Sequence, residues 1–258
     1  MNPWWLAFAL LVLAACANAP SADTAQPPAA HGEFADESLS VGWNRRAYRL
    51  YVPPSVDLTR AAPLVVAFHG MLIDNKDVMP KYTRLNDTAQ RHGFIIVYPN
   101  ALGGSWGLAP DKVIADVAFF DALLARLAAR YRIDADRVYM LGMSNGGYFA
   151  HLLARERSSI IAAAASHSGP LGLQTLGGIN AARKFPVMIV HGTADAIFPV
   201  AWARENADKY RREGHEVQYV EVPGLGHAWA SEANINERIW AFFAAHPRGG
   251  ASSASDRR

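Results

Sequence analysis

The chain has 258 residues, of which 51 % are hydrophobic and 19 % are charged, and this suits one globular domain with a full core. The formal net charge of +2 and the lack of any Lys/Arg-rich block exclude nucleic acid as an expected partner. The single cysteine, Cys16, excludes an intrachain disulfide framework and a cysteine-based metal cluster.

The first segment of the chain has the features of an export signal. Residues 4–15 form an apolar run that is too short to span a bilayer comfortably but has the length of a signal-peptide core. Residues 13–16, Leu-Ala-Ala-Cys, resemble a bacterial lipobox, in which the cysteine is lipidated and becomes the mature N-terminus. We therefore expect residues 1–15 to be a lipoprotein signal peptide and Cys16 to anchor an exported protein to a membrane. An ordinary cleaved signal is the alternative.

Strand and helix patterns alternate along the rest of the chain, between a tether expected at residues 16–35 and a disordered tail expected at residues 247–258. Strands are predicted at residues 46–52, 63–68, 94–98, 137–141, 160–165, 186–190 and 217–222. Helices are predicted at residues 82–92, 111–131, 145–155, 200–212 and 232–244. The alternation predicts one α/β domain over residues 36–246, with a mostly parallel sheet covered by helices on both faces.

Residues 142–146, Gly-Met-Ser-Asn-Gly, fit the G-x-S-x-G pattern of a nucleophile elbow. An apolar β-branched run leads into this segment and a helix-like run follows it, which is the strand–turn–helix setting that holds the serine exposed at the top of a sheet. The glycines are needed because a Cβ two residues before or after Ser144 would clash in the crowded turn. We predict that Ser144 is a catalytic nucleophile; a Gly/Ser-rich loop with no catalytic role is the alternative.

A serine hydroxyl is a poor nucleophile at neutral pH and needs a base within hydrogen-bond reach. Functional groups gather at the carboxyl ends of the strands in sheets of this kind. His227 follows the last predicted strand in a Gly-rich loop that can bring its side chain over the serine, whereas His215 precedes that strand and His151 lies inside the helix after Ser144. We therefore predict that His227 is the general base.

The base needs a carboxylate that fixes its tautomer and stabilises the imidazolium. Hydrolases with a nucleophile elbow carry their catalytic groups in the order serine, acid, histidine. Asp195 follows the strand predicted at residues 186–190, whereas Glu205 and Asp208 lie on a helix and suit a solvated face. We predict that Asp195 is the acid of the triad; a turn-capping aspartate is the alternative.

Acyl transfer also needs donors for a developing oxyanion, and two backbone N–H groups would serve. The residue after the nucleophile, Asn145, is expected to supply one. The loop after the strand at residues 63–68 begins His69-Gly70-Met71, and the Met71 amide is the second candidate, with Gly70 allowing a close backbone approach. His69 itself suits a structural loop residue better than a general base.

The substrate side of the predicted site is open and aromatic. The segment after the strand at residues 160–165, where many such enzymes insert a lid, is short and Gly-rich, so we expect no large lid domain and an open cleft. Trp106, Tyr148, Phe198 and Trp229 are candidates to line an acyl or aryl pocket. Packing in the rim or the core is the alternative for each of these four.

Taken together, several stretches resemble the α/β-hydrolase superfamily, and within it the polyhydroxybutyrate-depolymerase-like and feruloyl-esterase-like secreted serine esterases. They are Phe68-His69-Gly70, Tyr98-Pro99-Asn100, the helix around Asp116, residues 134–139 running into residues 142–147, His191-Gly192-Thr193-Ala194-Asp195 and Gly226-His227-Ala228-Trp229.

The resemblance implies an α/β-hydrolase fold and the hydrolysis of carboxylic esters through an acyl-enzyme, without metal or cofactor. The expected substrates are small or oligomeric esters of the short hydroxyacyl, aryl or acetyl type, and the membrane is an expected partner only through the N-terminal lipid. Two other functions stay open. One is a serine peptidase or amidase of the same fold, and the other is a non-catalytic surface lipoprotein.

Overall fold

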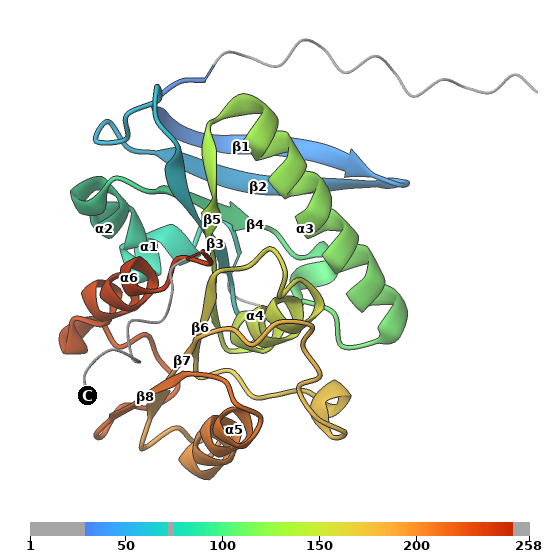
Figure 1. The fold of residues 1–258 in the computed structure, drawn as a ribbon, viewed down its shortest axis with the longest axis vertical. Coiled ribbons are helices and arrows are strands. Elements are labelled where there is room, and N and C mark those ends of the chain that lie inside the picture. The colour runs from blue at the N-terminus through green and yellow to red at the C-terminus, as the bar shows by residue number, and fades with distance from the viewer. Residues whose placement is uncertain (1–28, 72–74, 250–258) are drawn as a thin grey trace, which may run out of the picture.

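The computed structural model describes residues 29–71 and 75–249 (Figure 1). The predicted signal peptide, Cys16 and most of the predicted tether lie outside the described residues, as do residues 250–258 of the predicted tail. Among the described residues, no helix combines the length and the apolar character that crossing a membrane requires.

The described strands form a single sheet in the order β1-β2-β4-β3-β5-β6-β7-β8 (Figure 1). They are β1 (Gly32–Val41), β2 (Asn44–Val52), β3 (Ala62–Phe68), β4 (Ile95–Pro99), β5 (Ile133–Met143), β6 (Ala163–His167), β7 (Val187–Gly192) and β8 (Val217–Val222). Strands β1, β2 and β4 pair antiparallel, and every pair from β4 to β8 is parallel. The mostly parallel sheet predicted from the sequence is confirmed.

Helices cover both faces of this sheet (Figure 1). They are α1 (Met79–Thr83), α2 (Leu85–His92), α3 (Pro110–Arg130), α4 (Asn145–Glu156), α5 (Val200–Arg212) and α6 (Ile235–Ala245). Helices α3, α4 and α5 pack on one face, and α1, α2 and α6 pack on the other. Short 3₁₀ turns lie at η1 (Leu102–Gly104), η2 (Leu173–Thr175) and η3 (Ser231–Ala233).

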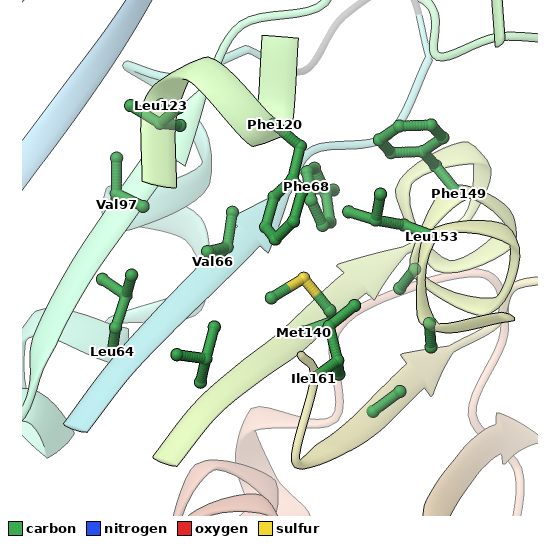
Figure 2. Packing of buried hydrophobic residues seen from close by; sticks show 14 of the residues in the cluster. Leu64, Val66, Phe68, Val97, Phe120, Leu123, Met140, Phe149, Leu153 and Ile161 are labelled. Atoms are coloured by element: carbon green, nitrogen blue, oxygen red, sulfur yellow. The ribbon is translucent and has the colours of Figure 1, made fainter. Parts of the chain in front are cut away.

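The central strands are apolar along their whole length because both of their faces are covered. In β3 every residue is buried, and alternate side chains enter the two hydrophobic clusters. Phe68 joins the layer beneath α3 and α4, whereas Ala67 joins the layer beneath α6. Figure 2 shows part of the first layer, where Phe68 and Met140 of the sheet lie among side chains that include Phe149 and Leu153 of α4.

The two ends of the domain extend further than the sequence predicted. Strand β1 pairs with β2 from Gly32 onward, so residues 32–35 belong to the sheet and not to the tether. At the other end, the Arg248 amide donates to the Asp136 carbonyl at 2.7 Å and its guanidinium bonds the Asp136 carboxylate at 2.8 Å. This contact holds the first residues of the predicted tail against the domain.

Two further segments bear on the predicted elements. The helix predicted at residues 82–92 is divided into α1 and α2 by Arg84, whose φ of 55° is left-handed and ends the first helix. The connection between β6 and β7 is described throughout and contains only the single turn η2, so no lid domain is inserted at this point of the chain.

Candidate active site

Ser144 occupies the sharp turn between β5 and α4. Its φ of 55° and ψ of −120° lie in a region that a non-glycine residue rarely adopts. The turn is tight because a Cβ at Gly142 would lie 2.1 Å from the Gly146 carbonyl oxygen, and a Cβ at Gly146 would lie 2.1 Å from the Phe68 carbonyl oxygen. Both glycines of the G-x-S-x-G segment are therefore required by close backbone approach.

The neighbouring strand fixes the backbone at this turn. The Ser144 amide donates to the His167 carbonyl at the end of β6, at 2.9 Å. On the helical side, the Ser144 carbonyl accepts a hydrogen bond of 2.9 Å from the Tyr148 amide and so begins α4. The strained conformation is held from both directions, and the hydroxyl projects at the carboxyl edge of the sheet.

The ring of His227 lies between Ser144 and Asp195. His227 follows β8, and its Nε2 is 2.9 Å from Ser144 Oγ while its Nδ1 is 2.7 Å from Asp195 Oδ2. An ionised carboxylate only accepts hydrogen bonds, so Nδ1 carries the hydrogen and donates it to Asp195. The other nitrogen, Nε2, is then the acceptor that faces the serine hydroxyl, which is the tautomer a general base needs.

Asp195 lies in the loop after β7, and its side chain is shielded from solvent. Its Oδ1 accepts hydrogen bonds of 2.9 Å from the amides of Ile197 and Phe198. Burial raises the pKa of this carboxyl, but the hydrogen bonds from the Phe198 amide, the His227 ring and the Ile197 amide outweigh it, so the pKa lies below its usual value. The group is therefore an anion at neutral pH.

The loops after β7 and β8 carry these two side chains and are tied to each other. The Thr193 amide donates to the Val222 carbonyl at 3.0 Å, and the Ala194 amide donates to the Leu225 carbonyl at 2.9 Å. The Gly224 amide in turn donates to Thr193 Oγ1 at 2.9 Å. Because the strands are parallel neighbours, the acid and the histidine reach the same edge although 32 residues separate them.

Trp106 connects the two segments that carry the predicted oxyanion donors. Its indole Nε1 donates to the His69 carbonyl at 3.0 Å, and its amide donates to Asn145 Oδ1 at 2.6 Å. The next amide, that of Gly107, donates to the buried Asp116 carboxylate at 2.8 Å and fixes the loop from behind. Trp106 is therefore a buried bridge between the loop after β3 and the start of α4.

A cavity of about 1180 Å³ opens in front of Ser144 and His227. Most of its wall is apolar and comes from the loop after β3, the start of α4, the segment after β6 and the segment before α5. Met71 and Asn145, the predicted sources of the oxyanion donors, both contribute to this wall. The cavity can admit an acyl or aryl group directly against the serine hydroxyl.

Four aromatic residues were predicted to line this cavity, and for two of them the structure contradicts the prediction. Tyr148 and Phe198 line it. Trp106 is fully buried between Phe68 and Phe149, because its indole is used to bridge two backbone segments. Trp229 is also buried and stacks on His167 at a ring separation of 4.8 Å, so its indole packs against this histidine instead of lining the cavity.

The sequence of this chain matches a known family over a stretch that includes Ser144 and ends before Asp195 and His227. The family is that of the esterase PHB depolymerases, and its model matches residues 46–183, which are 138 of the 258 residues. The protein belongs to the PHB depolymerase esterase family. The predicted resemblance and the α/β-hydrolase fold are confirmed with it.

Individual relatives agree with the family assignment. The chain is 29 % identical over 179 residues to the putative esterase NocK of Nocardia uniformis subsp. tsuyamanensis, covering 67 % of this chain and 52 % of that protein. It is 28 % identical over 237 residues to feruloyl esterase D of Neurospora crassa, covering 85 % of this chain and 79 % of that protein. This member of the PHB depolymerase family thus spans about half the length of NocK.

A solved structure shows the same fold. The ferulic acid esterase of Anaeromyces mucronatus, in complex with ferulic acid, superposes with a TM-score of 0.66 at 17 % sequence identity. The alignment covers 88 % of this chain and 93 % of that chain. At this level of identity the likeness concerns the arrangement of the sheet and helices alone.

Two further histidines of this family member lie beside the acid and the serine, and the sequence reasoning did not select either. His191 Nε2 donates to the Phe198 carbonyl at 2.7 Å and lies 3.4 Å from Asp195 Oδ2. His167 is buried, and its Nε2 accepts from the Ala230 amide at 3.1 Å. Both stand at the carboxyl ends of strands, β7 and β6, and that position is the signal that could have drawn attention to them.

Proposed function

We propose that this protein hydrolyses carboxylic esters through an acyl-enzyme on Ser144, with His227 as general base and acid and Asp195 as the carboxylate partner of His227. The observation that carries the proposal is the continuous chain of hydrogen bonds from Ser144 Oγ through the His227 ring to Asp195, at 2.9 and 2.7 Å. Membership of an esterase family supports ester bonds over other acyl compounds as substrates.

The first half of the reaction begins as His227 Nε2 takes the proton of the Ser144 hydroxyl while Oγ attacks the ester carbonyl carbon. The imidazolium that forms is stabilised by Asp195, whose lowered pKa keeps it ionised. His227 then gives the proton to the departing alkoxide, so the alcohol leaves and the acyl group stays on Oγ. A water molecule deprotonated by the same nitrogen releases the acid and regenerates the serine.

The backbone amides of Met71 and Asn145 are proposed to hold the oxyanion of the tetrahedral intermediate. Asn145 is the first residue of α4, so its N–H has no carbonyl partner one turn earlier in the helix. The positive end of the helix dipole also favours negative charge at this point. The Trp106 bridge supports the proposal because it fixes the spacing between the two segments that carry these amides.

The substrate is proposed to be an ester with an apolar acyl or aryl group. Tyr148 and Phe198 offer flat apolar surfaces in the wall of the cavity, and relatives named as feruloyl esterases suit an aryl ester. Short hydroxyacyl and acetyl esters fit the same space. We further propose that the protein is exported and held at a membrane by a lipid on Cys16, on the sequence of its first segment alone.

The proposal is tested by turnover of a panel made of p-nitrophenyl acetate, p-nitrophenyl butyrate, methyl ferulate and hydroxybutyrate oligomers. Ser144→Ala should abolish turnover of every ester that the wild type hydrolyses, and the exposed control Ser231→Ala should not. Activity of Ser144→Ala near the wild-type level would remove Ser144 from the mechanism. Hydrolysis of a peptide panel without ester hydrolysis would replace the esterase with an amidase of the same fold.

A further inference from the structure

The exposed apolar side chains of this protein gather around the catalytic cavity. Large apolar side chains that are at least one-third exposed occur at several points on its wall, among them Met71, Val78, Tyr82, Ile197 and Trp202. Burying such groups is favourable and exposing them together is unfavourable, so a contiguous exposed set marks a surface that binds an apolar partner.

A second groove of about 660 Å³ continues this apolar surface beyond the catalytic cavity. Leu108 and Leu173 border both spaces, so the two meet along these side chains. The groove then runs along α3, where Val117 and Ala118 are two of its lining residues and Ile114, which is 71 % exposed, stands at its side. None of these side chains takes part in the chemistry at Ser144.

The charged groups at this groove are already paired with protein partners. Arg157 donates to both carboxylate oxygens of Asp121, at 2.8 and 2.6 Å, and to the Glu156 carbonyl at 3.1 Å. The Glu156 carboxylate is in turn bonded by Arg155. A bidentate pair of this kind offers no free charge to a ligand. The groove therefore suits a neutral, apolar chain and not an anion.

We propose that this groove is a binding subsite for the distal part of an extended, neutral aliphatic ester whose carbonyl carbon lies at Ser144. The inference rests on the proposed function. The available volume supports the proposal. Pockets for drug-sized ligands measure about 300–1,000 Å³, and here a catalytic cavity of about 1180 Å³ is followed by a further 660 Å³ of groove. An acetyl or feruloyl group leaves the α3 groove empty, and only a long chain crosses Leu108 and Leu173 to reach it.

The test compares kcat/KM for soluble p-nitrophenyl esters from acetate to dodecanoate, each below its critical micelle concentration. Each methylene group that moves from water into an apolar groove raises kcat/KM about fourfold. In Ile114→Gln the ratio of kcat/KM for dodecanoate to that for acetate should fall about tenfold. Ala118→Gln places a longer polar side chain in the groove and should lower the same ratio.

The control is Trp43→Gln, since Trp43 is fully exposed on the turn between β1 and β2 and lines neither cavity. This variant should keep the wild-type ratio. An unchanged ratio in Ile114→Gln, with melting temperatures equal to the wild type, overturns the subsite. Loss of binding to phosphatidylcholine vesicles by Ile114→Gln, with no change in the ratio for soluble esters, assigns the groove to a lipid surface and also overturns it.

A binding measurement separates this inference from the proposed function. Ser144→Ala should bind p-nitrophenyl decanoate without turning it over, and quenching of tryptophan fluorescence reports the binding because Trp202 lies in the cavity wall. Adding Ile114→Gln should weaken that binding about tenfold. If the wild type hydrolyses no ester, the proposed function fails, while weaker binding in the double variant would still support the groove. Equal binding by both proteins overturns the groove whatever the wild type hydrolyses.

Discussion

His151 is buried and His227 is partly buried, and the two rings also differ in the partners of their nitrogens, which decide whether a histidine can act as a base. His227 holds a carboxylate on one ring nitrogen and a serine hydroxyl on the other. His151 Nδ1, within α4, lies 2.9 Å from the Tyr210 hydroxyl, and its Nε2 has no hydrogen-bond partner among the described residues. Burial lowers the pKa of His151 to about 3, so this ring stays neutral at neutral pH.

A histidine buried without a charged partner is inert, whereas His227, with a carboxylate on one ring nitrogen and a serine hydroxyl on the other, is suited to act as a base. A neutral ring among apolar groups cannot accept a proton because nothing stabilises the cation. Asp195 supplies that stabilisation to His227, and its own charge is held by two backbone amides. We therefore expect the carboxylate to decide the chemistry, and variants at both histidines test this expectation.

The largest expected effect is that of removing the base. His227→Ala should lower kcat/KM for p-nitrophenyl acetate by at least about 10⁴-fold, because no other group can take the serine proton. The matched variant His151→Phe should keep kcat/KM close to the wild-type value. Equal losses of activity in His151→Phe and His227→Ala, in preparations with equal circular dichroism spectra, would contradict the different roles assigned to these two histidines.

The next largest effect is expected from Asp195→Asn. The amide no longer stabilises the imidazolium and favours the wrong tautomer of His227, so kcat should fall by about 10³ to 10⁴-fold. Asp208→Asn is a suitable control, since Asp208 is exposed on α5 and forms an ion pair with Arg211 on the same helix. Steady-state kinetics on the same ester measure both. A wild-type rate in Asp195→Asn would point to another carboxylate.

A smaller loss is expected when the bridge between the oxyanion segments is weakened. Trp106→Phe removes the indole donor to the His69 carbonyl and should lower kcat by about 10 to 100-fold, because small displacements of positioned groups are costly in catalysis. KM should change much less. Trp240→Phe, on α6 and stacked on Phe94, is the matched control and should leave kcat unchanged. A change confined to KM would argue that Trp106 shapes the cavity instead.

A separate expected effect concerns stability in mild acid and does not involve catalysis. Burial lowers the pKa of both His151 and His167 to about 3, so below about pH 6.5 the unfolded chain takes up protons that the native state does not. Stability should therefore fall by about 1.4 kcal/mol per pH unit for each histidine between about pH 6.5 and 4. The free energy of unfolding, measured with urea at a series of pH values, should show this slope. His151→Phe should lower the slope by the contribution of one proton, about 1.4 kcal/mol per pH unit. An identical slope in His151→Phe would contradict the assignment.

The sequence was informative wherever local chemistry and strand order act together. The G-x-S-x-G segment predicted a turn whose glycines are indeed required by backbone contacts of 2.1 Å. The rule that functional groups lie at the carboxyl ends of strands selected His227 and Asp195 from many alternatives, and these two side chains lie in contact with each other. Both inferences need only the element type and its order along the chain.

The sequence was less informative where tertiary contacts decide. Trp106 lies in a Gly-rich segment and was expected at the cavity, but its indole finds a buried carbonyl that only the folded chain supplies. Strand β1 was missed because it is half-buried, carries several acidic residues and contains a bulge between Phe34 and Glu37, so its alternation is broken. The continuity between the catalytic cavity and the α3 groove likewise has no signature in the order of residues.

Reaction of the purified protein with a fluorophosphonate probe, followed by mass spectrometry of its peptides, tests the central claim most directly. The probe labels a serine only when a base activates it. We expect one adduct, on Ser144, that is absent in Ser144→Ala and forms far more slowly in His227→Ala than in His151→Phe. Labelling of another residue, or ester turnover by a protein that is not labelled at Ser144, would exclude Ser144 as the activated nucleophile.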